Sequence, residues 1–179
     1  MALSRPWRVV CQALAEEDVE YVFGLPGNPE LLYNDLYDFP QVKPILVRHE
    51  TSAVFMAMGY ARVSGRVGVV HASPGPGMAN LVPGLLEAYY ACSPLVSLVS
   101  AADRNYEGMG VFQETPSLDL ARPVSKWAVR IDLAHRTTWT TFAFSGSSFQ
   151  SPLWNSSIRV PTYSTASASS TGFALDSVR

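Results

Sequence analysis

The sequence predicts an α/β fold of three layers, in which a mostly parallel sheet carries helices on both faces. Short, continuous apolar runs recur along residues 1–131, and helical patterns separate them. Such runs are typical of parallel strands, because the crossover helices bury both faces of the sheet. The chain has 179 residues, which is enough for one domain with a substantial core.

Each expected element follows from a local pattern. Apolar residues from Trp7 to Leu14 recur at i, i+3, i+4 and i+7, which predicts a first helix. Further helices are expected from Asn28, after Glu50 and over about 78–90. The expected strands are the runs YVFG, ILV, VGVV, PLVSLVS and SKWAVRI, at 21–24, 45–47, 67–70, 94–100 and 125–131.

Four residues are expected to shape the helices, three at helix ends and one in a helix interior. Asn28 can cap the second helix, with Pro29 at its first position. Gly65 can end the third helix. Pro83 removes a hydrogen bond from the fourth helix and can kink it.

Four loops of unusual composition follow the expected strands. They are GLPGNP, RHE, HASPGPG and ADRNYEGMGVFQE. Right-handed crossovers place all such loops along one edge of a parallel sheet, where open α/β sheets bind ligands. The sequence therefore predicts a binding site at this edge.

Residues 132–179 differ from the first part. They contain SGSSFQS, NSS and STASASST, with scattered aromatic residues and no regular period. We interpret 1–131 as the folded domain and 132–179 as a Ser/Thr-rich tail that is disordered or non-native.

Charge and composition exclude several classes of partner. The net charge is -2 and no long basic run occurs, which argues against nucleic acid or an anionic membrane as partner. No apolar stretch reaches membrane-spanning length, and the N-terminus lacks a secretory pattern, so a cytoplasmic protein is expected. Cys11 and Cys92 fit neither a disulfide framework nor a zinc site, and are expected to be buried thiols.

The glycine-rich loop HASPGPGMAN does not complete a dinucleotide fingerprint. Gly75 and Gly77 are followed by Asn80 where a third glycine belongs, and no acidic residue ends the next strand. A Walker lysine is absent as well. Taken alone, the glycines are explained as well by a tight loop against another backbone.

Glu50 is the stronger chemical signal. A carboxylate at a helix N-terminus is stabilised by the helix dipole, which is a sufficient explanation for an isolated RHE. The helix that follows is rich in Ala and Met, so the carboxyl group should lie partly out of water. There it holds a proton more readily and can exchange it with a ring nitrogen.

Four segments in register resemble one enzyme family. VFGLPGNPELL, RHETSAVFMAMGYARVSGRVGVV, SPGPGMANLVPGLLEAYYACSPLVSLVS and GMGVFQE with PVSKWAV resemble the N-terminal, pyrimidine-binding domain of thiamine-diphosphate-dependent enzymes, from about residue 5 to 131. The branch is the acetolactate synthase-like group, with 2-hydroxyacyl-CoA lyases, oxalyl-CoA decarboxylases and benzoylformate decarboxylases as related members. The resemblance implies the thiamine-diphosphate-binding fold and a transferase or lyase acting on 2-oxo acids.

The resemblance implies roles for residues in each loop. In this family the glutamate matching Glu50 hydrogen-bonds N1′ of the cofactor's aminopyrimidine, and the cofactor serves as electron sink. His71 stands where benzoylformate decarboxylase-like members place an active-site histidine, although a structural histidine explains it as well. The further implied positions are Pro26, Gly27, Asn28, Gly75, Pro76, Gly77 and Asn80 beside the cofactor, and Phe112 and Gln113 on the substrate side.

The family also needs a second domain, which holds the diphosphate through Mg²⁺ with an Asp of a GDG motif. The chain contains no GDG, so we expect no metal ligand in it, and Mg²⁺ only where a partner domain supplies the ligands. We expect a fragment that lacks the last helix and strand of its domain and is inactive alone. It would form a homodimer or pair with a diphosphate-binding domain.

Three alternatives stay open. The chain can be a non-catalytic interaction module that pairs with full-length family members. It can be a subunit complemented by a diphosphate domain on a separate chain. It can also be the N-terminal half of a 2-hydroxyacyl-CoA lyase or oxalyl-CoA decarboxylase-like enzyme.

Overall fold

The computed structural model has one sheet of six strands, in the order β2-β1-β3-β4-β6-β5. The structure describes residues 6–27, 31–102, 104–131 and 140–145, all within the first of two compact units, Met1–Phe149. The strands are β1 (Tyr21–Gly24), β2 (Lys43–Leu46), β3 (Gly68–Ala72), β4 (Leu95–Ser100), β5 (Trp127–Ile131) and β6 (Thr140–Ser145). The helices are α1 (Pro6–Glu16), α2 (Leu31–Leu36), α3 (Glu50–Ser64), α4 (Pro76–Tyr90) and α5 (Ser117–Ala121), with 3₁₀ turns η1 (Arg104–Tyr106) and η2 (Arg122–Val124).

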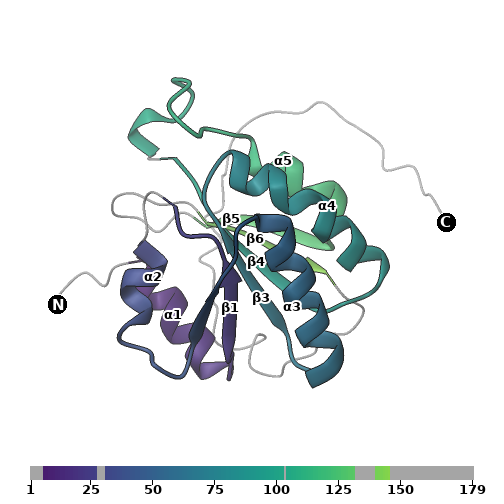
Figure 1. The fold of residues 1–179 in the computed structure, drawn as a ribbon. Helices are drawn as coiled ribbons and strands as arrows, with labels where there is room; N and C mark the ends of the chain where they lie inside the picture. Colours follow the sequence, from purple (N-terminus) through teal and green to yellow (C-terminus); the bar gives the residue numbers. More distant parts are fainter. Residues whose placement is uncertain (1–5, 28–30, 103, 132–139, 146–179) are drawn as a thin grey trace, which may run out of the picture. The chain divides into compact units, whose positions relative to one another are not determined.

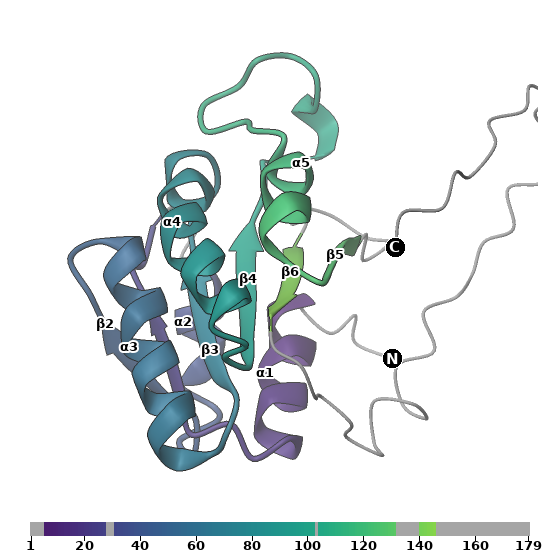
Figure 2. The ribbon, with the colours of Figure 1, turned by 90° about the vertical axis from the view of Figure 1, so that its right-hand side faces the viewer.

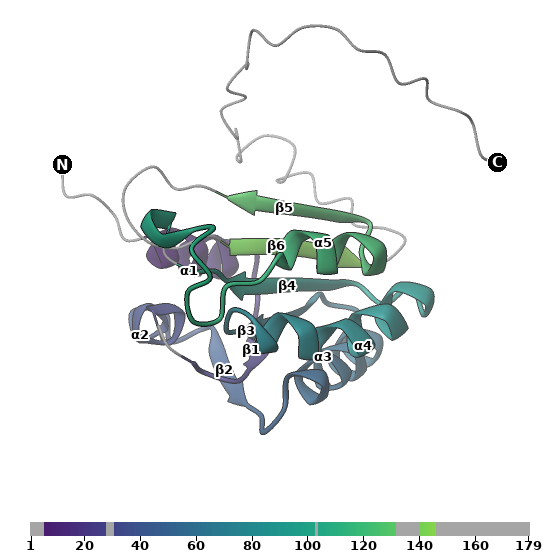
Figure 3. The same ribbon diagram turned by 90° about the horizontal axis from the view of Figure 1, so that it is seen from above.

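The arrangement confirms the predicted α/β fold. β2, β1, β3 and β4 are mutually parallel, with Val22 opposite Val69 and Val69 opposite Val96. Helices α1 and α2 lie on one face of the sheet, and α3, α4 and α5 lie on the other (Figures 1 and 3). The strand-to-helix loops therefore share the carboxyl edge of the parallel strands, as predicted.

Two apolar cores fill the space on the two faces of the sheet. Alternate residues of a strand point to opposite faces, so Val70 and Ala72 of β3 enter one core while Val69 enters the other. The core under α3 and α4 includes Ala53, Val54, Ala57, Met78, Leu81, Leu85 and Val99. The core under α1 and α2 includes Trp7, Cys11, Leu14, Leu32, Leu36, Val96 and Leu98.

The helix ends follow the sequence signals where the structure describes them. Gly65 has φ 72° and its N–H donates to Ala61 O at 3.0 Å, which ends α3 as predicted. Helix α4 begins at Pro76, earlier than predicted, because Pro is favoured in the first turn, and it continues through Pro83. The predicted cap Asn28 lies outside the described residues.

The far end of the sheet differs from the sequence prediction. β5 forms where it was expected, but it pairs with β6, which runs antiparallel to both β5 and β4 (Figure 2). Strand β6 lies within the segment that the sequence analysis interprets as a tail. Its run TTFAFS carries Phe142 and Phe144 at a spacing of two, a strand pattern. The strand also provides backbone partners for β4, which would otherwise end the parallel sheet.

The two cysteines lie in different environments. Cys11 is buried, and burial raises the pKa of its thiol to about 12. Cys92 is exposed, contrary to the expectation, since it lies in the turn after α4 with φ 52°. Over the described part of the chain, no helix has the length and apolar character needed to cross a membrane.

Candidate functional site

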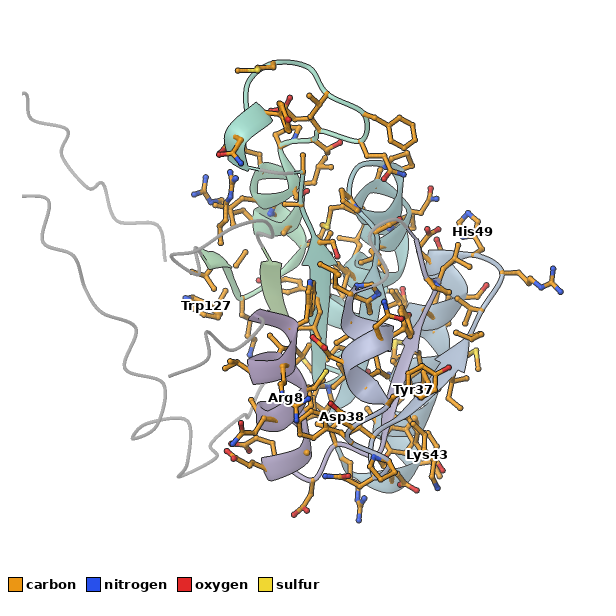
Figure 4. The ribbon with its side chains drawn as sticks, turned by 90° about the vertical axis from the view of Figure 1, so that its left-hand side faces the viewer. Arg8, Tyr37, Asp38, Lys43, His49 and Trp127 are labelled. Atoms are coloured by element: carbon orange, nitrogen blue, oxygen red, sulfur yellow. The ribbon has the colours of Figure 1, made fainter. Side chains whose placement is uncertain are left out.

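The charged triplet before α3 is divided between solvent and the interior. Arg48 and His49 are exposed, whereas Glu50 is only 5% exposed. His49 caps the helix, since its Nδ1 accepts from Thr51 N at 3.3 Å, and its ring lies at the outer surface (Figure 4). The cap turns the chain so that Glu50, the first helical residue, points inward at the carboxyl edge of the sheet.

Glu50 is held by helix α4. Asn80 Nδ2 donates a hydrogen bond of 2.9 Å to Glu50 Oε2. Thr51 Oγ1 donates to the backbone O of Asn80, which ties the same two helices a second time. Among the described residues, Glu50 Oε1 accepts no hydrogen bond. A buried carboxylate with one oxygen fixed and one available can bind a ring nitrogen.

Glycines let two loops approach this carboxylate. A Cβ added at Gly77 would lie 3.5 Å from Glu50 Oε1 and 2.9 Å from Ser73 Oγ. A Cβ added at Gly27 would lie 2.6 Å from Ser73 Cβ, closer than real Cβ atoms come. The turn after β1 and the loop after β3 therefore meet at Ser73, next to Glu50.

A third loop packs on the glycine-rich loop. Gly75 has φ 66°, and a Cβ there would lie 3.0 Å from both Cα and O of Gln113. Phe112, the neighbour of Gln113, is 85% exposed. The structure thus brings Gln113 to the rim of the site through its backbone, while the Phe112 ring faces solvent.

His71 lies on the opposite face of the sheet from Glu50. It is 1% exposed, with Nδ1 at 3.3 Å from Tyr33 Oη and Nε2 at 3.4 Å from Ser100 Oγ. Trp7 and Tyr33 pack edge-on against its ring. Burial lowers its pKa from 6.5 to about 3. These contacts are those of a neutral imidazole in the core.

The predicted site residues therefore separate into groups. Glu50, Gly77 and Asn80 come together directly, Gly27 joins them through Ser73, and Gln113 joins through Gly75. Pro26 is half-buried in the turn after β1 and Pro76 is exposed at the start of α4, while Asn28 lies outside the described residues. The sequence analysis missed Thr51 and Ser73, whose small hydroxyl side chains carry no pattern of their own.

The chain matches the family model described as "Thiamine pyrophosphate enzyme, N-terminal TPP binding domain" over residues 7–121, well over half of its length. This chain belongs to the thiamine pyrophosphate enzyme family. The site described above lies within the matched region, and the resemblance drawn from the sequence is confirmed.

Several relatives of this thiamine pyrophosphate enzyme domain are acetolactate synthases. The acetolactate synthase large subunit of Haemophilus influenzae is 44% identical over 119 residues, 66% of this chain and 21% of the relative. That of Lactococcus lactis is 38% identical over 125 residues, 69% of this chain and 22% of the relative. The chloroplastic acetolactate synthase of Arabidopsis thaliana is 38% identical over 119 residues, which are 66% of this chain and 18% of the relative. The chain thus spans about a fifth of the length of these relatives.

The residues present fit the pyrimidine end of thiamine diphosphate. Glu50 offers a carboxylate oxygen without a hydrogen bond from the described residues, in a position that water barely reaches. Gly77 leaves the space beside that oxygen free of a side chain. Within the described ranges, no three His, Cys, Asp or Glu residues are grouped to hold a metal ion.

Proposed function

We propose that this chain binds the aminopyrimidine half of thiamine diphosphate, as the pyrimidine half-site of an acetolactate synthase-like enzyme acting on 2-oxo acids. One observation carries the proposal. Glu50 is buried at the carboxyl edge of the sheet, with Oε2 held by Asn80 at 2.9 Å and Oε1 without a hydrogen bond from the residues that the structure describes. The names of the acetolactate synthase relatives support this branch of the family over the CoA-dependent branches.

The chain's own residues then have distinct tasks. Glu50 holds a proton at a carboxylate oxygen and exchanges it with the pyrimidine nitrogen, since a general acid–base must lie within hydrogen-bond reach of its partner. Asn80 orients the carboxylate, and Gly77 leaves room for the flat ring. Thiamine diphosphate itself supplies the electron sink that lets a 2-oxo acid lose its carboxylate.

The half-site needs a diphosphate-binding domain to turn over substrate. No GDG occurs in the 179 residues, so the Mg²⁺ ligands must come from residues outside this sequence, on the same or another polypeptide. We propose that the chain alone is inactive and that it pairs with such a domain, as a homodimer of a longer chain or with a separate subunit.

A complementation experiment tests the proposed function. The chain is mixed with the part of the Haemophilus influenzae acetolactate synthase large subunit that follows the matched region. CO₂ release from pyruvate is then measured with thiamine diphosphate and Mg²⁺. We expect turnover only in the mixture, and a loss of at least about 100-fold in Glu50→Gln. A folded but inactive mixture, or an active Glu50→Gln mixture, would contradict the proposal.

A second candidate function rests on the surface of α3 and α4. Large apolar side chains are exposed along these helices, although their buried faces already fill the core. They are Phe55, Met56, Val63, Leu86 and Tyr90. An apolar surface of this kind favours a non-catalytic module that pairs with a full-length family member. Co-purification with an intact acetolactate synthase, with no affinity of the chain for thiamine diphosphate, would favour this function over the first.

A further inference from the structure

The segment between η1 and α5 forms a loop with its own internal support. We call residues 107–114 the rim loop, because it extends beyond the carboxyl edge of the sheet (Figures 1 and 2). It contains two glycines with positive φ, Gly108 at 78° and Gly110 at 69°, and nothing lies within 4 Å of a Cβ added at either. Neither glycine is therefore required by packing, and each serves the path of the backbone.

The carboxylate of Glu114 lies in the concave side of this loop. Gly110 N donates to Glu114 Oε2 at 2.8 Å, and Val111 N donates to the same oxygen at 3.2 Å. Gly108 N donates to Oε1. Successive backbone N–H groups that converge in this way form an anion-binding nest. In this chain the anion is the side chain of the loop's own last residue.

A second contact fixes the loop to the sheet. Glu107, the first residue of the rim loop, pairs with Arg130 of β5. Arg130 also acts on Glu114, since its charge contributes to lowering the pKa of that carboxyl. The two ends of the rim loop are thus held by acidic side chains, one to the neighbouring strand and one to the backbone of the loop itself.

The closed loop sets the position of Gln113. This residue has φ 64°, which is unfavourable for a side chain other than Asn or Asp and has to be maintained by its surroundings. Its Cα and O lie against Gly75, a residue of the glycine-rich loop beside Glu50. A change in the rim loop would therefore reach the glycine-rich loop through this contact.

We propose that Glu114 is a positioning residue: its carboxylate closes the rim loop and so keeps the Gln113 backbone against Gly75. The positioning role rests on the proposed function, because the position of this loop affects cofactor and substrate only if the chain binds them. The loop closure itself does not depend on that function, and the two can be tested separately.

The closure should depend on pH in a stated direction. The N–H of Gly108 lowers the pKa of Glu114 below its usual 4.5, with smaller contributions from Gly110, Val111 and Arg130, while burial opposes them. Of the charged groups near the loop, Arg130 favours the ionised form, and Arg130 also pairs with Glu107. Because the pKa of Glu114 is lower in the folded chain than in the unfolded chain, ionised Glu114 stabilises the closed loop at a pH above its unfolded pKa. This stabilisation is lost as the pH falls through the folded pKa.

Nuclear magnetic resonance of the full chain tests the proposal directly. In the wild type, the amide protons of Gly108, Gly110 and Val111 should shift together as Glu114 is protonated. Glu114→Ala should abolish this shared titration and make the three amides exchange with solvent at least about fivefold faster. Glu114→Gln, which keeps one acceptor oxygen, should restore part of the protection.

The decisive readout is the Gly75 amide resonance, which should move in Glu114→Ala and stay in place in Asp119→Asn. Asp119 is the matched control, an exposed carboxylate on α5 that pairs with Arg122. Closure without any response at Gly75 would overturn the positioning role. If the amides of Gly108, Gly110 and Val111 do not shift together in the wild type, the closure of the loop by Glu114 is overturned. This result does not require any variant to fold. Neither result depends on thiamine diphosphate binding. A failure of the chain to bind the cofactor would therefore be detected in a separate experiment and would leave the loop closure untouched.

Discussion

Asn80 Nδ2 and Glu50 Oε2 are joined by a hydrogen bond of 2.9 Å that links α4 to the first residue of α3. The two residues come from the N-terminal parts of separate helices at the carboxyl edge of the sheet, and only the parallel topology brings them together. The bond satisfies one oxygen of a carboxylate that is almost fully buried. The amide thereby fixes the orientation of the group on which the proposed chemistry depends.

Asn80→Ala should lower the free energy of unfolding by about 1–3 kcal/mol, because it leaves a buried carboxylate oxygen without a donor. Urea denaturation measures the loss. Gln12→Ala is the matched control, since Gln12 Nε2 donates to Glu16 Oε1 at 2.8 Å on an exposed surface, where solvent replaces the lost donor. Equal losses in the two variants would count against a special role of the Asn80 bond.

Gly84→Ala and Gly59→Ala should change stability in opposite directions. A Cβ at Gly84 of α4 would lie 2.6 Å from Val54 Cβ of α3, so the helices must separate at a cost of about 1–3 kcal/mol. Nothing lies within 4 Å of a Cβ at Gly59, where alanine should stabilise the helix by about 0.5–1 kcal/mol. Thermal denaturation of both variants checks the packing of α3 on α4, and a stabilising Gly84→Ala would refute it.

Gly75→Ala should cost more than Gly65→Ala, although both glycines have positive φ. Backbone strain alone should cost about 1–2 kcal/mol at Gly65, whose φ of 72° and ψ of 7° are left-handed helical. It should cost more at Gly75, whose φ of 66° and ψ of -115° only glycine adopts readily. At Gly65 the added Cβ meets nothing within 4 Å, whereas at Gly75 it meets the Gln113 backbone at 3.0 Å. The difference between the two unfolding free energies, expected to be about 1 kcal/mol or more, combines the contact between the loops with the greater backbone strain at Gly75. Equal costs would mean that the rim loop does not rest on Gly75.

Acid should destabilise the chain through His71. Its folded pKa of about 3 lies below the unfolded value of 6.5, so the unfolded state binds more protons between these values. Stability should therefore fall as pH falls from 6.5, by up to about 1.4 kcal/mol per pH unit from this residue. His71→Gln should reduce that slope between pH 6 and pH 4, as measured by denaturation at each pH.

The sequence was largely sufficient for the parallel part of the sheet, because apolar runs bounded by turn residues mark β1, β3 and β4. The edge strand β2 begins earlier than its predicted run ILV and includes the exposed residues Lys43 and Pro44. The family resemblance implied that Glu50 and Asn80 lie near the cofactor, but the hydrogen bond between them was not predicted from the sequence. The orientation of His71 depends on the pleat of β3, since adjacent residues face opposite sides, and the apolar run gives no register. The pairing of β6 with β4 joins segments that are separated in the chain by α5 and β5, which local periodicity does not encode.

The Glu114 nest shows a different limit of sequence reasoning. GMGVFQE was recognised as a motif for its Phe and Gln, yet the structure gives its glutamate three backbone hydrogen bonds. The two glycines before it permit the positive φ values that turn the amides inward. A carboxylate that follows closely spaced glycines is a signal that could have been read, but many loops share it.

Calorimetric titration of thiamine diphosphate tests the central claim most directly. Wild type, Glu50→Gln and the matched control Glu87→Gln, at an exposed position on α4, are each titrated with Mg²⁺ present, alone and with the diphosphate-binding part of the Haemophilus influenzae relative. We predict that the mixture containing wild type or Glu87→Gln binds the cofactor and that Glu50→Gln binds it at least about tenfold more weakly, as expected for loss of a hydrogen bond to a charged group. Equal affinity of Glu50→Gln and wild type, or no binding by any folded mixture, would contradict the assignment of Glu50 to the pyrimidine half-site.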